Sequence, residues 1–123
     1  MIQREHNRIA FGGGHYIGDL LTPLAAIHQA IKLGYEEIEL DFRSCEAAFA
    51  APMLALCAQV MKMRSEGIAF QLLLPKLDQL ATLFQNTSWA HFLDPGNYAP
   101  SKFKGFRMVP APSSPMMWSK TRP

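Results

Sequence analysis

The sequence predicts a small α/β domain with a mainly parallel central sheet and helices after the strands. Short apolar or alternating runs are separated by amphipathic stretches long enough for helical crossovers, which is typical of parallel strands. The chain has 123 residues, 49% hydrophobic and 18% charged, as expected of one domain with a buried core.

The first strand and helix are indicated by their end signals. Residues 8–11 form a short apolar run, and Gly12, Gly13 and Gly14 end it as a turn. Thr22 is expected to cap a helix whose first residue is Pro23, because the missing N–H of proline would be unpaired there. Apolar side chains then recur at helical spacing up to Gly34, which suits a left-handed helix end.

Two more strands and helices follow. Residues 35–42 alternate acidic with apolar side chains and predict a strand. A second helix is expected from Pro52 to Gly67, and residues 68–74 predict a strand covered on both faces. Residues 77–86 predict a third helix. The apolar stripe of the second helix is predicted to contain Met53, Leu56, Cys57, Val60 and Met61, with Met63 at the surface.

The chain changes character after Pro95. Six of the nine prolines fall in residues 94–123, and this segment has five basic residues against one acid. Proline-rich sequence holds neither a helix nor a central strand. We therefore divide the chain into a domain at 1–95 and a proline-rich extended tail or interdomain linker at 96–123.

The middle of the chain resembles the STAS domains of sulphate transporters and anti-sigma-factor antagonists. The resemblance lies in residues 37–42, which end in Leu40-Asp41-Phe42, then a short loop, the apolar helix from Pro52 and the apolar strand at 67–75. It implies a small STAS-like sandwich. Residues 86–95 are similar to the end of STAS-like domains that precede a histidine-kinase-like ATPase domain.

One feature of that family is missing. Anti-sigma-factor antagonists have a phosphorylatable serine at the start of the second helix, where this chain has Phe49-Ala50-Ala51-Pro52. Alanine cannot be phosphorylated, so a phosphate switch at that position is excluded. The resemblance still implies docking on a protein partner, and the partner that it suggests is a histidine-kinase-like ATPase domain in cis or trans. The expected partner-binding residues are Ser44, Cys45, Glu46, Phe49, Ala50, Ala51 and Met53.

A second hypothesis is a small-ligand or nucleotide sensor. Gly12, Gly13 and Gly14 lie between a strand and a helix, where backbone N–H groups can hold an anion, and Asp41 ends a central strand. The glycines lack the spacing of a phosphate loop and are also explained as a flexible turn. Asp41 is also explained as a loop cap that accepts N–H bonds from the turn at 43–45.

The remaining chemistry-bearing residues predict no enzyme, metal site or cofactor. Cys45 and Cys57 are interpreted as reduced, buried and small apolar residues. The four histidines (His6, His15, His28 and His91) have no ligand at metal-site spacing. The domain has no basic face for nucleic acid and no membrane-length apolar run, so we expect a cytoplasmic protein-binding module.

Overall fold

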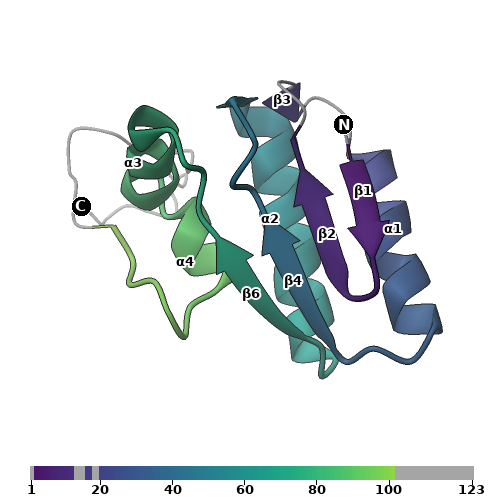
Figure 1. The fold of residues 1–123 in the computed structure, drawn as a ribbon. Coiled ribbons are helices and arrows are strands. Elements are labelled where there is room, and N and C mark those ends of the chain that lie inside the picture. The colour runs from purple at the N-terminus through teal and green to yellow at the C-terminus, as the bar shows by residue number, and fades with distance from the viewer. Residues whose placement is uncertain (1, 13–15, 18–19, 102–123) are drawn as a thin grey trace.

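The computed structural model describes residues 2–12, 16–17 and 20–101. It is a mixed α/β fold, as the sequence predicts, with helices between the parallel strands (Figure 1). The strands are β1 (Ile2–Glu5), β2 (Arg8–Phe11), β3 (Tyr16–Ile17), β4 (Glu37–Asp41), β5 (Ala47–Ala48) and β6 (Ala69–Leu73). The helices are α1 (Leu21–Lys32), α2 (Ala50–Ser65), α3 (Asp78–Asn86) and α4 (Trp89–Leu93).

The main sheet has the strand order β1-β2-β4-β6. Strands β2, β4 and β6 are parallel, with Ile9 opposite Leu40 and Leu40 opposite Leu72. Strand β1 is antiparallel to β2 and forms one edge. A separate parallel pair joins β3 to β5. The sheet is therefore mostly parallel, and the carboxyl ends of its three parallel strands lie at one end of the molecule.

The helices of residues 20–101 cover one face of the sheet. In Figure 1, α1, α2 and α4 lie behind the strands, and the other face is open. The strands show this by alternation, since Phe70 and Leu72 of β6 are buried while Ala69 and Gln71 are exposed. The expectation that this strand is covered on both faces is wrong, because no helix of the described chain packs on the open face. That face instead has polar pairs, including Arg8 with Glu39 across β2 and β4.

The structure also corrects details of the helices. Helix α1 starts at Leu21, with Leu20 as its capping residue, because the N–H of Leu24 bonds to the carbonyl of Leu20 (3.2 Å). Thr22 therefore lies inside the first turn and is not the cap. Pro23 is the third helical residue, where its missing N–H still costs no helical hydrogen bond. Gly34 ends the helix region with a positive φ of 105°, as predicted.

The two methionines at the end of α2 are exchanged relative to the prediction. Met63 is buried in the core, and Met61 is exposed. With about 3.6 residues per turn, Met63 continues the spacing of Met53, Leu56 and Val60 more closely than Met61, which falls to one side of the stripe.

The edge at β6 is closed by the segment that follows α4. The buried carboxylate of Asp94 accepts the N–H of Leu72 (3.0 Å), and the hydroxyl of Tyr98 donates to the carbonyl of Leu72 (3.2 Å). Further on, the N–H of Ser101 donates to the Oγ of Ser88 (2.8 Å). The packed part of the chain thus continues past the predicted boundary at residue 95, and the rest of the predicted tail, 102–123, lies outside the described residues.

Four aromatic rings connect the carboxyl end of the sheet to α3 and α4. Phe11 stacks on Phe42 (centroids 4.1 Å apart), and the edge-to-face pairs Phe42–Phe84 and Phe84–Trp89 extend the row. All four side chains are buried. Aromatic pairs add about 0.5–1.5 kcal/mol each beyond their burial, so this row holds the loops at that end against the helices.

Candidate protein-docking site

The loop after β4 is held in place by Asp41. Its carboxylate accepts the backbone N–H of Arg43 (3.0 Å) and, from the guanidinium of the same residue, Nε (3.0 Å) and Nη2 (2.9 Å). These side-chain hydrogen bonds lower the pKa of Asp41 below its ordinary value against the opposing effect of burial. The loop-capping interpretation of Asp41 is confirmed, and the guanidinium occupies both carboxylate oxygens.

Gly12 packs directly against the same loop. A Cβ atom at Gly12 would lie 2.6 Å from the Cβ of Ser44 and 3.3 Å from its carbonyl carbon. Only glycine permits this approach of β2 to the loop. Of the proposed ligand-sensing residues, Gly12 and Asp41 are therefore both engaged by the 43–44 turn, and Gly13 and Gly14 lie outside the described residues.

Cys45 and Met53 belong to the core. Both side chains are buried, and the thiol of Cys45 donates to the carbonyl of Ala47 (3.3 Å). Burial raises the pKa of Cys45, and it raises the pKa of Cys57 to about 12. The two cysteines are free and buried, as predicted. Neither Cys45 nor Met53 can contact a partner in this conformation, so their inclusion among the partner-binding residues is corrected.

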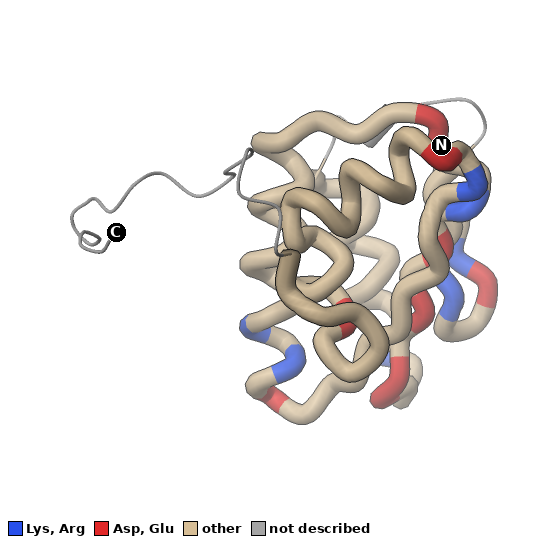
Figure 2. The backbone as a smooth tube through the Cα atoms, turned by 90° about the vertical axis from the view of Figure 1, so that its left-hand side faces the viewer, with Lys and Arg blue, Asp and Glu red and all other residues tan. Residues whose placement is uncertain are grey.

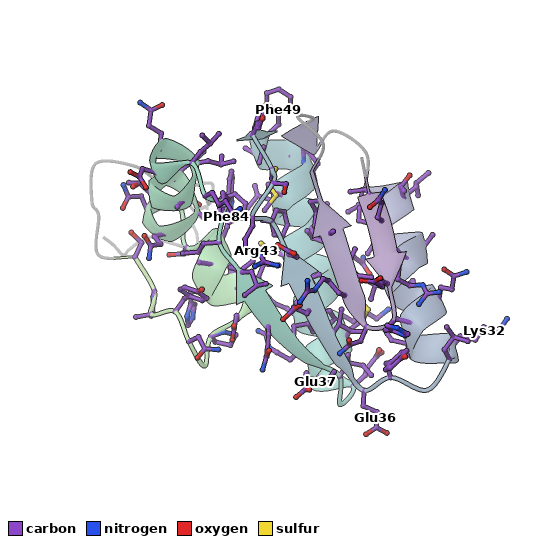
Figure 3. All side chains as sticks on the ribbon, in the orientation of Figure 1. Lys32, Glu36, Glu37, Arg43, Phe49 and Phe84 are labelled. Carbon is purple, nitrogen blue, oxygen red and sulfur yellow. The ribbon has the colours of Figure 1, made fainter. Side chains whose placement is uncertain are left out.

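The other five expected partner-binding residues are brought together at the surface. Ser44, Glu46, Phe49, Ala50 and Ala51 are all exposed, and we call them the docking surface. Phe49 is the capping residue of α2, and 53% of it is exposed. Figure 3 places Phe49 at the carboxyl end of the sheet, opposite Glu36 and Glu37 at the other end.

A groove of about 420 Å³ adjoins the docking surface. One wall is Glu46, Ala47 and Ala48, and the other is the start of α3. The α3 wall consists of Leu77, Asp78, Gln79, Leu80 and Leu83. We call this depression the β5–α3 groove. Among the described residues that line it, the charged ones are Glu46 and Asp78, both acidic.

The α3 wall was missed by the sequence analysis. The sequence predicts a helix over 77–86, and the spacing of Leu77 with Leu80 and Phe84 predicts that Leu77 shares its apolar face. In the structure Leu77 is the capping residue before α3, and 49% of it is exposed. The sequence offers no signal for this exposure, because Leu77 stands three and seven residues before the buried Leu80 and Phe84, on the same helical spacing.

We also searched the described residues for a metal site and for a membrane-spanning helix. In the part of the chain that the structure describes, His, Cys, Asp and Glu side chains form no group of three that could hold a metal ion. Within the same residues, no helix has the length and apolar character needed to cross a membrane.

Comparison with known proteins adds no relative. No protein-family model, no curated protein and no solved structure matches the chain.

Proposed function

We propose that this chain is a non-catalytic regulatory protein-interaction module. It docks a cytoplasmic protein partner through the docking surface and the adjoining β5–α3 groove. The partner suggested by the family resemblance is a histidine-kinase-like ATPase domain, either in the same polypeptide or separate from it.

The exposed ring of Phe49 is the observation that carries this proposal. Phe49 directly follows Ala48, which lines a groove together with Ala47, Leu77 and Leu83. Scattered exposed apolar residues are ordinary, but an aromatic side chain next to an apolar groove is the usual anchor of a protein interface. The acidic groups Glu46 and Asp78 provide a polar rim, which is also usual for interfaces.

The surface is supported from below, which favours binding without large rearrangement. Asp41 fixes the loop, and Phe42 is buried in the row of aromatic rings under it. A preformed surface loses less conformational entropy on binding than a flexible loop.

The chemistry at this surface favours docking over catalysis. Cys45 would need a thiolate to act as a nucleophile, but its burial raises its pKa. Where a phosphate switch would require a hydroxyl, the chain has Ala50 and Ala51. We therefore propose that docking here is not controlled by phosphorylation of the second helix.

A photo-crosslinking experiment tests the proposal in the source cells. Phe49 is replaced by p-benzoylphenylalanine, and the crosslinked protein is identified by mass spectrometry. We expect one major adduct, containing a histidine-kinase-like ATPase domain. The matched control places the same residue at Leu33, an exposed leucine at the other end of the molecule. No adduct at position 49, or the same adduct from position 33, would contradict the docking surface.

Affinity measurements with the purified partner then localise the contact. Ala50→Arg and Ala51→Arg put a long charged side chain on the docking surface and should abolish binding, with an unchanged circular dichroism spectrum. Ala58→Arg is the matched control, because Ala58 is also exposed on α2 but lies two turns further along. Equal affinity of all three variants and the wild type would refute this assignment.

A further inference from the structure

The β5–α3 groove has the chemistry to hold a basic and aromatic segment. In the described part of the chain, its walls are formed largely by alanine and leucine side chains, and the charged residues that line it, Glu46 and Asp78, are both acidic and exposed. Nearby Arg43 is paired with Asp41 on the open face of the sheet. An occupant with large apolar side chains between positive charges would match this groove.

The chain itself contains such a segment immediately after the last described residue. Residues 102–109 read Lys-Phe-Lys-Gly-Phe-Arg-Met-Val, with three basic side chains and no acidic one. Phe103 and Phe106 provide large rings, and the cations Lys102, Lys104 and Arg107 alternate with the apolar residues. The remaining tail, 110–123, has its apolar residues in Met116, Met117 and Trp118, further from the folded part.

The attachment point makes the groove reachable. Ser101 is bonded to Ser88, at the junction between α3 and α4 (Figure 1). The groove is lined by the first half of α3 and by Leu83. Nine-residue α3 is about 14 Å long, whereas eight extended residues span about 26 Å. Residues 102–109 are therefore long enough to run back along α3 to the groove.

We propose that residues 102–109 dock in the β5–α3 groove of the same chain. Phe103 and Phe106 occupy the apolar part of the groove, and the basic side chains face Glu46 and Asp78. Because both carboxylates are exposed, the rings provide most of the affinity and the charges provide a salt-dependent part.

Docking of the tail would regulate the module. The segment would cover Ala47, Ala48 and Leu77, next to Phe49, so a partner that uses the groove would have to displace it. This consequence rests on the proposed function, whereas the docking itself involves this chain alone.

Nuclear magnetic resonance of the full chain labelled with nitrogen-15 tests the docking. In the double variant Phe103→Asp/Phe106→Asp, we expect shifts in the amide signals of Ala47, Ala48, Gln79 and Leu83. Signals from β1 and α1 should stay in place and show that the fold is intact. The matched control Met116→Asp/Met117→Asp introduces the same charges further along the tail and should leave the groove signals unchanged. Amide signals of the groove residues that do not shift in Phe103→Asp/Phe106→Asp would overturn the proposal.

A reciprocal measurement follows the tail. In the wild-type chain, the amide signals of residues 103–108 should differ from those of a synthetic peptide 102–109. Leu77→Glu should move them to the peptide positions, and Leu33→Glu should not. Tail signals that already coincide with the peptide would contradict the docking. Shifts that grow with protein concentration would show docking on a second copy and would overturn the assignment to the same chain.

These outcomes are separate from those of the partner experiment. Loss of the tail contact would not abolish crosslinking through position 49, because the partner would then no longer compete with the tail for the groove. Absence of a partner would equally leave the nuclear magnetic resonance result unaffected.

Discussion

The two ends of the sheet differ in what they expose. At the amino ends of the parallel strands, Lys32, Glu36 and Glu37 surround the turns (Figure 3). At the carboxyl ends, exposed Phe49 and Leu77 lie beside the β5–α3 groove. The first end exposes mainly charged side chains beside one exposed leucine, Leu33, whereas the second has exposed apolar side chains and a groove that another chain segment can cover. We therefore place the proposed binding at the carboxyl end.

Charge follows the same division over the rest of the molecule. Helices α3 and α4, nearest the viewer in Figure 2, have Asp78 as their one acidic or basic residue, apart from His91. Charged positions lie instead along the sheet side and at the lower end of that view. Desolvating a surface with few charges costs less free energy, which favours a protein contact there.

The largest effects on stability are expected from substitutions of Gly12 and Gly34, which lie at opposite ends of the sheet. Gly12→Ala should lower the free energy of unfolding by about 2 kcal/mol, because the new Cβ would overlap Ser44. Gly34→Ala at the opposite end should cost about 1 kcal/mol, because its φ of 105° is strained for alanine although no atom lies within 4 Å. Urea unfolding measures both. A smaller loss for Gly12→Ala than for Gly34→Ala would contradict the tight packing of β2 on the loop.

A smaller effect is expected when the loop loses its carboxylate. Asp41→Asn should lower the free energy of unfolding by about 1 kcal/mol at neutral pH, because its charge-assisted bonds are partly screened by solvent. Glu36→Gln, an exposed residue before β4, is the matched control and should have no measurable effect.

The pH dependence has a definite sign. The pKa of Asp41 is lowered in the folded state, so its stabilising contribution is present above the pKa of an unfolded aspartate, about 3.9. The contribution is lost as the pH falls through the lower folded pKa. The unfolding curves of the wild type and Asp41→Asn should therefore converge in acid. A difference that stays constant down to the acid limit would exclude the carboxylate as its source.

Local features of this fold could be predicted from the sequence. Gly34 and Gly67 ended their helices with positive φ, because glycine is the residue that adopts this conformation at low cost. Asp41 as a loop cap was also predictable, since it reaches a backbone N–H only two residues away. These features depend on neighbouring residues and need no knowledge of the tertiary structure.

Features that depend on distant residues could not be predicted. Strand β1 is a short, mostly polar segment, and pairing with β2 makes it a strand. The single covered face of β6 depends on where the helices pack, which the apolar run at 68–74 did not reveal. The β5–α3 groove joins Ala47 to Leu77 across thirty residues, and the order of strands in the sheet brings them together.

The smallest effects on stability are expected for the exposed apolar residues themselves. Phe49→Asp should not lower the free energy of unfolding, because Phe49 is largely exposed and an aspartate is a favourable capping residue at the start of α2. Leu33→Asp should lower it by less than about 1 kcal/mol, because Leu33 is exposed and an acidic side chain at the end of α1 opposes the helix dipole only weakly. Thermal or urea unfolding checks this. A large loss for either variant would mean that the residue supports the fold.

The same two variants give the most direct test of docking at the carboxyl end. The partner that crosslinking at position 49 identifies is purified and titrated calorimetrically. Phe49→Asp should bind it at least about 30-fold more weakly than the wild type does, which is the loss expected for an aromatic interface anchor. Leu33→Asp should bind like the wild type, although Leu33 is the more exposed residue, 62% against 53%. Equal affinity for both variants would contradict the account and would place the interface away from the carboxyl end of the sheet.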